Sequence, residues 1–162
     1  LDGDGADRVR VTGVRGRAAT PSYKVSMSYL DGYTAVGTLT YAWPDALEKA
    51  RAADGILRQR LADLGLVFEE IRTEFVGYNS CHGPLAAVPD EVNEVLLRFG
   101  VRGKSHDAVE RFGREIAPLI LTGPPSVTGF AGGRPHPSEV IAYWPALMPK
   151  SAVAPEVVVR TT

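Results

Sequence analysis

Short stretches of alternating apolar and polar residues recur along the chain, and this period of two is typical of strands with one exposed face. Residues 24–30 show the alternation clearly, because Val25, Met27 and Tyr29 are separated by lysine and serine. Residues 8–14 show a shorter alternation that predicts an edge strand. We therefore expect two strands in this part of the chain, the second of them half-buried.

The dipeptide Asp31-Gly32 follows directly and is a strong signal for a β-hairpin. Glycine tolerates the positive φ that a two-residue turn requires. Residues 33–41 predict the next strand. We expect this strand to pair antiparallel with residues 24–30.

Apolar residues spaced three and four apart predict two amphipathic helices. The first begins at Pro44, whose fixed φ suits a first helical position, and ends at Gly65. Its apolar positions are Leu47, Leu57, Leu61 and Leu64. The second begins after Ser105, which is suited to capping a helix N-terminus, and stops near residues 122–124. Its apolar stripe is Val109, Phe112, Ile116, Leu119 and Ile120.

Four further runs predict strands, at residues 68–76, 92–101, 140–144 and, in a short form, 157–159. The order of elements then contains two consecutive βαβ units, and right-handed crossovers would place both helices on one face of a mixed sheet. The predicted fold class is α+β, a ferredoxin-like βαββαβ sandwich with an extra N-terminal hairpin strand. The open face of this sheet would meet solvent or another domain.

Length and composition favour a single domain that spans residues 1–162. The chain has 162 residues, of which 44% are hydrophobic, and this is enough to bury a core. No internal repeat is evident, and the one biased segment is the Gly/Pro-rich stretch at residues 123–137. Because the sequence opens on Leu1 and not on methionine, we expect it to be a piece of a longer protein.

Charge and hydropathy exclude several classes of protein. With 18 basic and 19 acidic side chains spread along the chain, no basic patch is available to neutralise nucleic-acid phosphates. No apolar run reaches the roughly 18 residues that a membrane helix needs, and no signal peptide precedes the first strand. One cysteine and three histidines form no metal-ligand cluster of the usual spacing. A single cysteine cannot form an internal disulfide, which fits a reducing cytoplasm.

A polar loop after the strand that follows the first helix is one candidate site. Residues 77–84 read GYNSCHGP and bring Ser80, Cys81 and His82 into one short turn. Adjacent side chains of an extended segment point in opposite directions, so Cys81 and His82 are poorly placed as nucleophile and base. One interpretation makes His82 a general acid/base or a substrate donor, oriented by Ser80 and Asn79. In the other, these residues only satisfy the backbone groups of a turn.

A glycine-rich loop is the second candidate site, because it could hold an anionic group such as a phosphate or a carboxylate. Its residues are Thr122, Gly123, Gly129, Gly132 and Gly133, with Arg134 and His136 in support. Loops that cradle phosphate run from a strand into a helix N-terminus. This loop leaves a helix and enters a strand, so a mobile connection or a packing corner explains the glycines equally well.

Three other residues have simpler interpretations. His106 lies beside the capping Ser105 and is expected to be a solvated residue of the first helical turn. Trp43 and Trp144 are expected to pack in a core or an interface rather than to stack on a ligand. None of the three is therefore assigned to a site.

Four separated motifs carry a resemblance to known proteins: RVRVTGVRGR at residues 8–17, LDGY at 30–33, VGYNSCHG at 76–83 and LTGP at 121–124. In this order they resemble the C-terminal part of the acyclic terpene utilisation (AtuA-like) family, over residues 8–150. The resemblance implies a bacterial cytoplasmic protein with a large α/β portion before this region. It also implies a role in the breakdown of acyclic terpenoids and related branched acyl-CoA intermediates. The residues that match the family pattern at the two loops are Ser80, His82, Gly83, Thr122, Gly123 and Pro124.

Three hypotheses of function follow. In the first, the chain is the C-terminal part of a lyase or hydratase for a CoA-linked or otherwise acidic branched acyl substrate. His82 would transfer a proton, Ser80 and the glycine-rich loop would hold the substrate, and the N-terminal α/β portion or a partner subunit would complete the pocket. In the second, the chain is a non-catalytic assembly module that forms a homo-oligomer through the open sheet face, at Arg72 or Arg98. In the third, it is a sensor that binds an effector without converting it. No cofactor can be named from the sequence.

Overall fold

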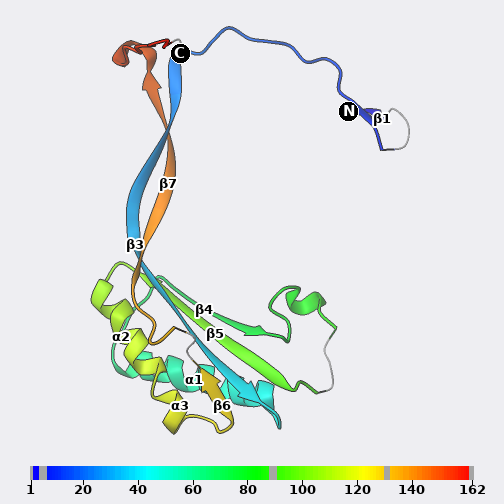
Figure 1. The fold of residues 1–162 in the computed structure, drawn as a ribbon, viewed down its shortest axis with the longest axis vertical. Coiled ribbons are helices and arrows are strands. Elements are labelled where there is room, and N and C mark those ends of the chain that lie inside the picture. Colours follow the sequence, from blue (N-terminus) through cyan, green and yellow to red (C-terminus); the bar gives the residue numbers. More distant parts are fainter. Residues whose placement is uncertain (1, 4–6, 88–90, 130–131, 161–162) are drawn as a thin grey trace. The chain divides into compact units, whose positions relative to one another are not determined.

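A computed structural model describes residues 2–3, 7–87, 91–129 and 132–160. The chain divides into two compact units (Figure 1): the first combines Leu1–Met27 with Tyr143–Thr162, and the second is Ser28–Ala142. Every described apolar residue that is buried belongs to the second unit. Among the described residues, no helix has both the length and the apolar content needed to cross a membrane.

A five-stranded sheet organises the fold. Its strand order is β4 (Glu70–Val76), β5 (Glu94–Gly103), β3 (Ser22–Ala42) and β6 (Val127–Gly129), and β7 (Ser138–Pro149) also pairs with β3. The β4–β5, β5–β3 and β3–β6 pairings are antiparallel. The predicted α+β class is confirmed. The predicted mixed sheet is wrong for these pairings, because the strands that run in the same direction, such as β3 and β4, are separated by a strand that runs the opposite way.

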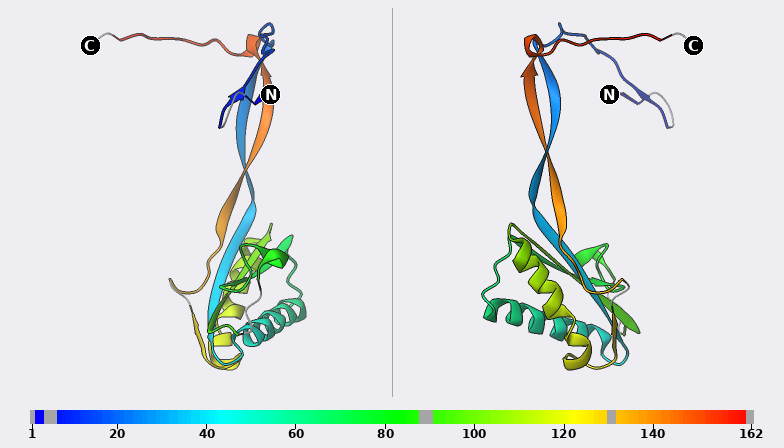
Figure 2. Two further views of the ribbon diagram at one scale, coloured as in Figure 1. Left: turned by 90° about the vertical axis from the view of Figure 1, so that its right-hand side faces the viewer. Right: turned by 60° about the vertical axis from the view of Figure 1, so that its left-hand side comes forward.

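One face of β5 holds the hydrophobic core. Burial alternates along this strand, so the buried side chains point to the same side. They are Val95, Leu97, Phe99 and Val101. Helices α1 (Ala46–Asp63) and α2 (His106–Ile116) both contact β5 and each other, and they therefore cover this face (Figure 2). The ring of Phe99 stacks on the ring of Phe112 with their centroids 5.6 Å apart.

Helix α1 confirms the first helical prediction. It begins at Ala46 rather than Pro44, because Asp45 adopts a left-handed conformation with a φ of 57°. Gly65 lies just beyond the end of the helix and has a φ of 66°, which suits a residue that terminates a helix. Its buried side chains include Leu47, Leu57 and Leu61 of the predicted stripe.

Helix α2 confirms the second helical prediction. The Oγ of Ser105 accepts a hydrogen bond from the backbone N–H of Ala108 at 3.2 Å, as expected of a capping serine. The predicted helix is nevertheless divided into two pieces. Pro118 precedes a separate short helix, α3 (Leu119–Thr122), because proline cannot donate the backbone hydrogen bond that would continue α2.

The hairpin predicted at Asp31-Gly32 is wrong, and so is the extra N-terminal hairpin strand, because β3 runs unbroken through both residues. The Asp31 carboxylate accepts hydrogen bonds from Arg102 and, at 2.5 Å, from Lys104. Gly32 has a φ of 92°, and a Cβ at this position would lie 2.6 Å from the carbonyl oxygen of Gly103. Both residues therefore serve the pairing of β3 with β5 and do not reverse the chain.

In the first unit, regular structure is less extensive than the pattern predicts. Strand β1 (Asp2–Gly3) pairs antiparallel with β2 (Val9–Arg10), so the strand expected at residues 8–14 is reduced to two residues. The strand expected at residues 157–159 is wrong, because these residues lie in irregular chain. Two 3-10 turns, η1 (Gly83–Leu85) in the second unit and η2 (Lys150–Ala152) in the first, complete the described elements.

The Asp31 ion pairs predict a pH dependence of stability. The hydrogen bond from Lys104 holds the pKa of the Asp31 carboxyl below its ordinary value of 3.8. Because the pKa is lower in the folded state, the carboxylate contributes stability above about pH 4, and this contribution is lost as the pH falls through the lowered pKa. We expect Asp31→Asn to lower the free energy of unfolding at pH 7 and to make it less sensitive to acid below pH 4.

Urea denaturation of wild type and variant at pH 7, 4 and 2.5 measures both effects. Glu156→Gln, at an exposed carboxylate in irregular chain, is the matched control. Identical pH profiles for wild type and Asp31→Asn would show that this carboxylate does not stabilise the fold.

Candidate functional site

The first candidate loop begins where β4 ends. The backbone N–H groups of Tyr78 and Asn79 both donate to the carbonyl of Phe75, at 3.2 and 3.3 Å, and Gly77 adopts a φ of 94°. These bonds close a tight turn around a hollow of about 140 Å³. The residues that line the hollow are Gly77, Tyr78, Asn79, Ser80, Cys81, His82 and Ala86. The structure thus brings the predicted residues Ser80 and His82 to one small surface site.

This site lacks the internal contacts of a working nucleophile and base. Cys81 and His82 are exposed, and Ser80 is partly exposed. Within the described part of the chain, no hydrogen bond joins any of these three side chains to another residue. A base in a catalytic pair is ordinarily oriented by a second hydrogen bond. The loop on its own therefore offers His82 as an accessible proton-transfer group but supplies no group that orients it.

In the second candidate loop, the first two residues have structural roles. The Thr122 hydroxyl donates to the Pro118 carbonyl at 2.9 Å and accepts from the Arg60 guanidinium at 3.2 Å. A Cβ on Gly123 would lie 2.5 Å from the carbonyl oxygen of Leu119. Both residues therefore lie at the end of α3, and Thr122 also connects this helix to α1.

The other three glycines differ from one another. Gly129 lies in β6, and a Cβ there would come within 2.8 Å of the Leu39 Cδ2 atom, so this glycine allows β6 to approach β3 closely. Gly132 and Gly133 have φ values of 103° and 90°, and no described atom lies within 4 Å of a Cβ built on either. These last two residues form an open turn that does not pack against another described residue.

The two candidate loops lie at opposite edges of the sheet. Val76, at the end of β4, is opposite Leu96, which is opposite Thr40, which in turn is opposite Thr128 of β6. Three strand spacings of about 4.8 Å separate the ends of this row, a distance of roughly 14 Å. A small acyl group therefore cannot contact the His82 loop and β6 of the same chain at once.

A third site was not predicted as such. Arg134 and His136, named from sequence as supports of the glycine-rich loop, lie with Arg114 of α2 around a hollow of about 320 Å³. The sequence signal was a pair of basic residues directly after the flexible glycines. The contribution of Arg114 could not be foreseen, because only the fold places the exposed side of α2 beside this segment.

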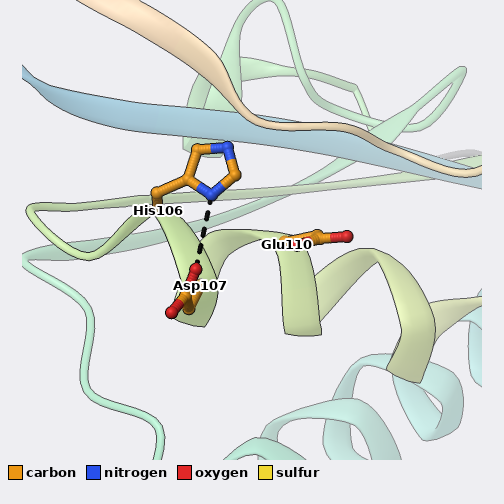
Figure 3. A group of neighbouring side chains, drawn as sticks. All are labelled: His106, Asp107 and Glu110. Carbon is orange, nitrogen blue, oxygen red and sulfur yellow. Dashed lines mark ion pairs between the residues drawn. The ribbon is translucent and has the colours of Figure 1, made fainter.

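Three side chains at the start of α2 form the one cluster of potential metal ligands found among the described residues. They are His106, Asp107 and Glu110, and one ligand atom of each lies within 4.8 Å of the others. Figure 3 shows the imidazole Nδ1 facing the Asp107 carboxylate, at 3.5 Å. All three come from adjacent turns of one helix, and Glu110 also pairs with Arg114 at 2.8 Å. His106 is exposed as expected, and its ring packs edge-on against Tyr33.

The open face of the sheet carries paired charges. Glu74 contacts Arg72 at 3.0 Å and Arg98 at 2.5 Å, and the Arg98 hydrogen bond lowers the pKa of Glu74. A hollow of about 180 Å³ lies on this face, over Gly100 and beside Arg72 and Arg102. Glu74 thus has two basic partners, whereas Glu70 beside the hollow forms no ion pair with another described residue, so the face is polar.

Comparison with known proteins identifies the family. The sequence model of a protein family, described as acyclic terpene utilisation family protein AtuA, matches residues 1–159. The chain belongs to this family. No curated protein and no solved structure matches it. Membership confirms the resemblance carried by the four sequence motifs, and it links this AtuA-family chain to acyclic terpene utilisation.

The structural roles assigned to glycines of this AtuA-family chain predict opposite effects of alanine at two positions. Gly123→Ala should lower the free energy of unfolding by about 1–3 kcal/mol, because its methyl group meets the Leu119 carbonyl at 2.5 Å. Gly55→Ala should raise it by about 0.5–1 kcal/mol, because Gly55 lies inside α1 with open space around it.

Urea denaturation of the two variants measures both signs in one experiment. Gly55→Ala serves as the control for the chemical change itself. If Gly123→Ala left the free energy of unfolding unchanged or raised it, Gly123 would have no packing role and would resemble Gly132 and Gly133.

Proposed function

We propose that this chain is the assembly module of an enzyme of acyclic-terpenoid or branched acyl-CoA catabolism, and that it associates with a second copy of itself through the ribbon of the first unit. The ribbon consists of the first residues of β3 and the last residues of β7, which pair with each other (Figure 1). The observation that carries the proposal is the apolar surface of this ribbon.

The first unit has no core of its own. Among its described residues, at 7–27 and 143–160, no side chain is buried. An isolated two-stranded ribbon is only marginally stable in water, and it needs further strands or a packed surface to become stable. A partner that covers the ribbon would supply what the unit lacks.

One face of the ribbon carries several large apolar residues, and the opposite face also carries Tyr143 and Leu147. Tyr23, Val25 and Met27 share one side of β3, because alternate residues of a strand point the same way. The N–H of Lys150 donates to the carbonyl of Pro21 at 2.9 Å, and the Lys150 ammonium lies 5.3 Å from the Tyr23 ring centroid.

Trp144, Ala146 and Met148 share one face of β7, because alternate residues of a strand point the same way. The contacts of Lys150 with Pro21 and Tyr23, at the end of the ribbon, favour the face of Tyr23 for these three residues. The exposed fractions are 40% for Tyr23, 47% for Met27 and 60% for Trp144. Exposure of several large apolar side chains on one surface marks an interaction site.

A second copy of the chain fits this face. Two aromatic rings and two methionines on each copy can form sulfur–aromatic contacts across a two-fold axis. The net charge of −1 imposes little repulsion between copies. The open sheet face is a weaker interface candidate, because its three arginines, Arg72, Arg98 and Arg102, already pair with carboxylates of the chain.

The ribbon predicts a self-association that depends on Trp144. Trp144→Ser should weaken the dimer by about 2 kcal/mol, as expected when a large interface aromatic is removed. Sedimentation equilibrium of the full chain across a hundredfold range of concentration measures this. Leu147→Ser is the matched control, because Leu147 is 75% exposed but lies on the opposite face.

Two results would contradict the proposal. One is a wild-type chain that stays monomeric at every concentration, which would point to the remaining α/β portion of the protein as the occupant. The other is an equal loss of association in both variants, which would show that the apolar face is not the contact surface.

A second candidate function, a lyase or hydratase site, is favoured by the His82 loop. The His82 side chain is exposed beside a hollow and forms no hydrogen bond with another described residue, so it is available for proton transfer. Ser80 would hold an acyl substrate beside it.

The fold does not decide between the two functions. The strand order of the second unit, with helices after β3 and β5, supports a ferredoxin-like topology. Proteins with this topology have many unrelated functions.

Catalysis by His82 predicts that His82→Ala lowers kcat by about a hundredfold or more, the usual contribution of a general acid or base. The free energy of unfolding should not change, because no described contact is lost. The assay uses the whole protein with a branched, unsaturated acyl-CoA and follows addition of water to the double bond. His106→Ala is the control, and unchanged kinetics in His82→Ala would eliminate this role.

A further inference from the structure

A hollow of about 320 Å³ in the second unit combines a helix surface with a loop. One wall comes from α2 and the other from the segment that follows the glycine-rich turn. The residues that line it are Glu110, Gly113, Arg114, Arg134, Pro135 and His136. The hollow is therefore built from two segments that are distant in sequence.

Close packing fixes the loop wall. A Cβ on Gly113 would lie 2.2 Å from the Pro135 carbonyl oxygen, so the loop backbone lies directly on α2. A Cβ on Gly37 of β3 would lie 3.1 Å from the Pro135 Cγ atom. Pro135 is thus held between a helix and a strand, which places its neighbours Arg134 and His136 in the lining of the hollow.

The charge balance of the hollow is positive. Arg114 pairs with Glu110 at 2.8 Å, which neutralises one guanidinium. Arg134 and His136 have no hydrogen bond or ion pair with any other described residue. One guanidinium and one imidazole are consequently free to donate to a ligand, while Arg114 keeps further N–H groups beyond those used by Glu110.

We propose that this hollow binds a phosphate group of a phosphate-bearing ligand. Arginine presents a planar fork of donors that matches phosphate oxygens, and charge-assisted hydrogen bonds of this kind are stronger than neutral ones. Three donor groups around the rim can serve three phosphate oxygens, whereas a carboxylate offers only two oxygens. The site is independent of the ribbon, which belongs to the first unit.

The test is an NMR titration of the full chain with inorganic phosphate, following the backbone amides of Gly113 and Gly133. Wild type should show saturable shifts. Arg134→Ala and Arg114→Ala should each weaken binding by about tenfold, because each removes a charge-assisted donor. Arg111→Ala is the matched control: it removes the same charge from α2, but Arg111 pairs with Glu115 and does not line the hollow.

Three outcomes would overturn the proposal. The first is a wild type with no saturable shift up to high phosphate concentration. The second is an Arg111→Ala variant whose binding is weakened as much as that of Arg134→Ala, which would indicate attraction by net charge alone. The third is acetate, titrated at the same ionic strength, binding as tightly as phosphate, which would assign the hollow to carboxylates.

Discussion

The one-sided burial of β5 is the constraint on which the second unit depends. Val95, Leu97, Phe99 and Val101 are at most 2% exposed, and both long helices lie over them. A slip of one residue in the pairing of β5 would turn these side chains to the open face, so the core fixes the register of the sheet. The same register sets the row from Val76 to Thr128 and therefore the distance between the two predicted loops.

The elements that sequence predicts well are those whose own apolar pattern determines their burial. Helices α1 and α2 and strands β4 and β5 each show a clear period, and each occurs near its predicted position. The hairpin at Asp31-Gly32 failed because the partners of Asp31 are 71 and 73 residues away, at Arg102 and Lys104. Local turn chemistry cannot reveal such contacts. Strand β6 was missed because three residues are too few to show a period.

The candidate sites also differ in whether local sequence or tertiary contacts determine them. Sequence located the Ser80–His82 loop correctly as a polar turn after a strand, since both the strand and the turn residues are local signals. It could not distinguish glycines that pack against other residues, such as Gly123 and Gly129, from glycines with open space around them, such as Gly132. The difference lies in which atoms a Cβ at each position would meet, and only the fold determines those atoms. For the same reason, the sequence did not predict that Arg114 lies beside Arg134 and His136.

The two units differ in what they need from other molecules. The second unit buries its own apolar residues, so its surface is free to carry binding groups such as the basic hollow. The first unit exposes tyrosine, methionine and tryptophan on a ribbon without a core, so its order depends on being covered. Association would then have to supply the free energy that orders the ribbon. This cost lowers the affinity gained per square ångström of buried surface. Under the two proposals, assembly and ligand binding would use separate units of this AtuA-family chain, so a substitution at one surface would leave the residues of the other in place.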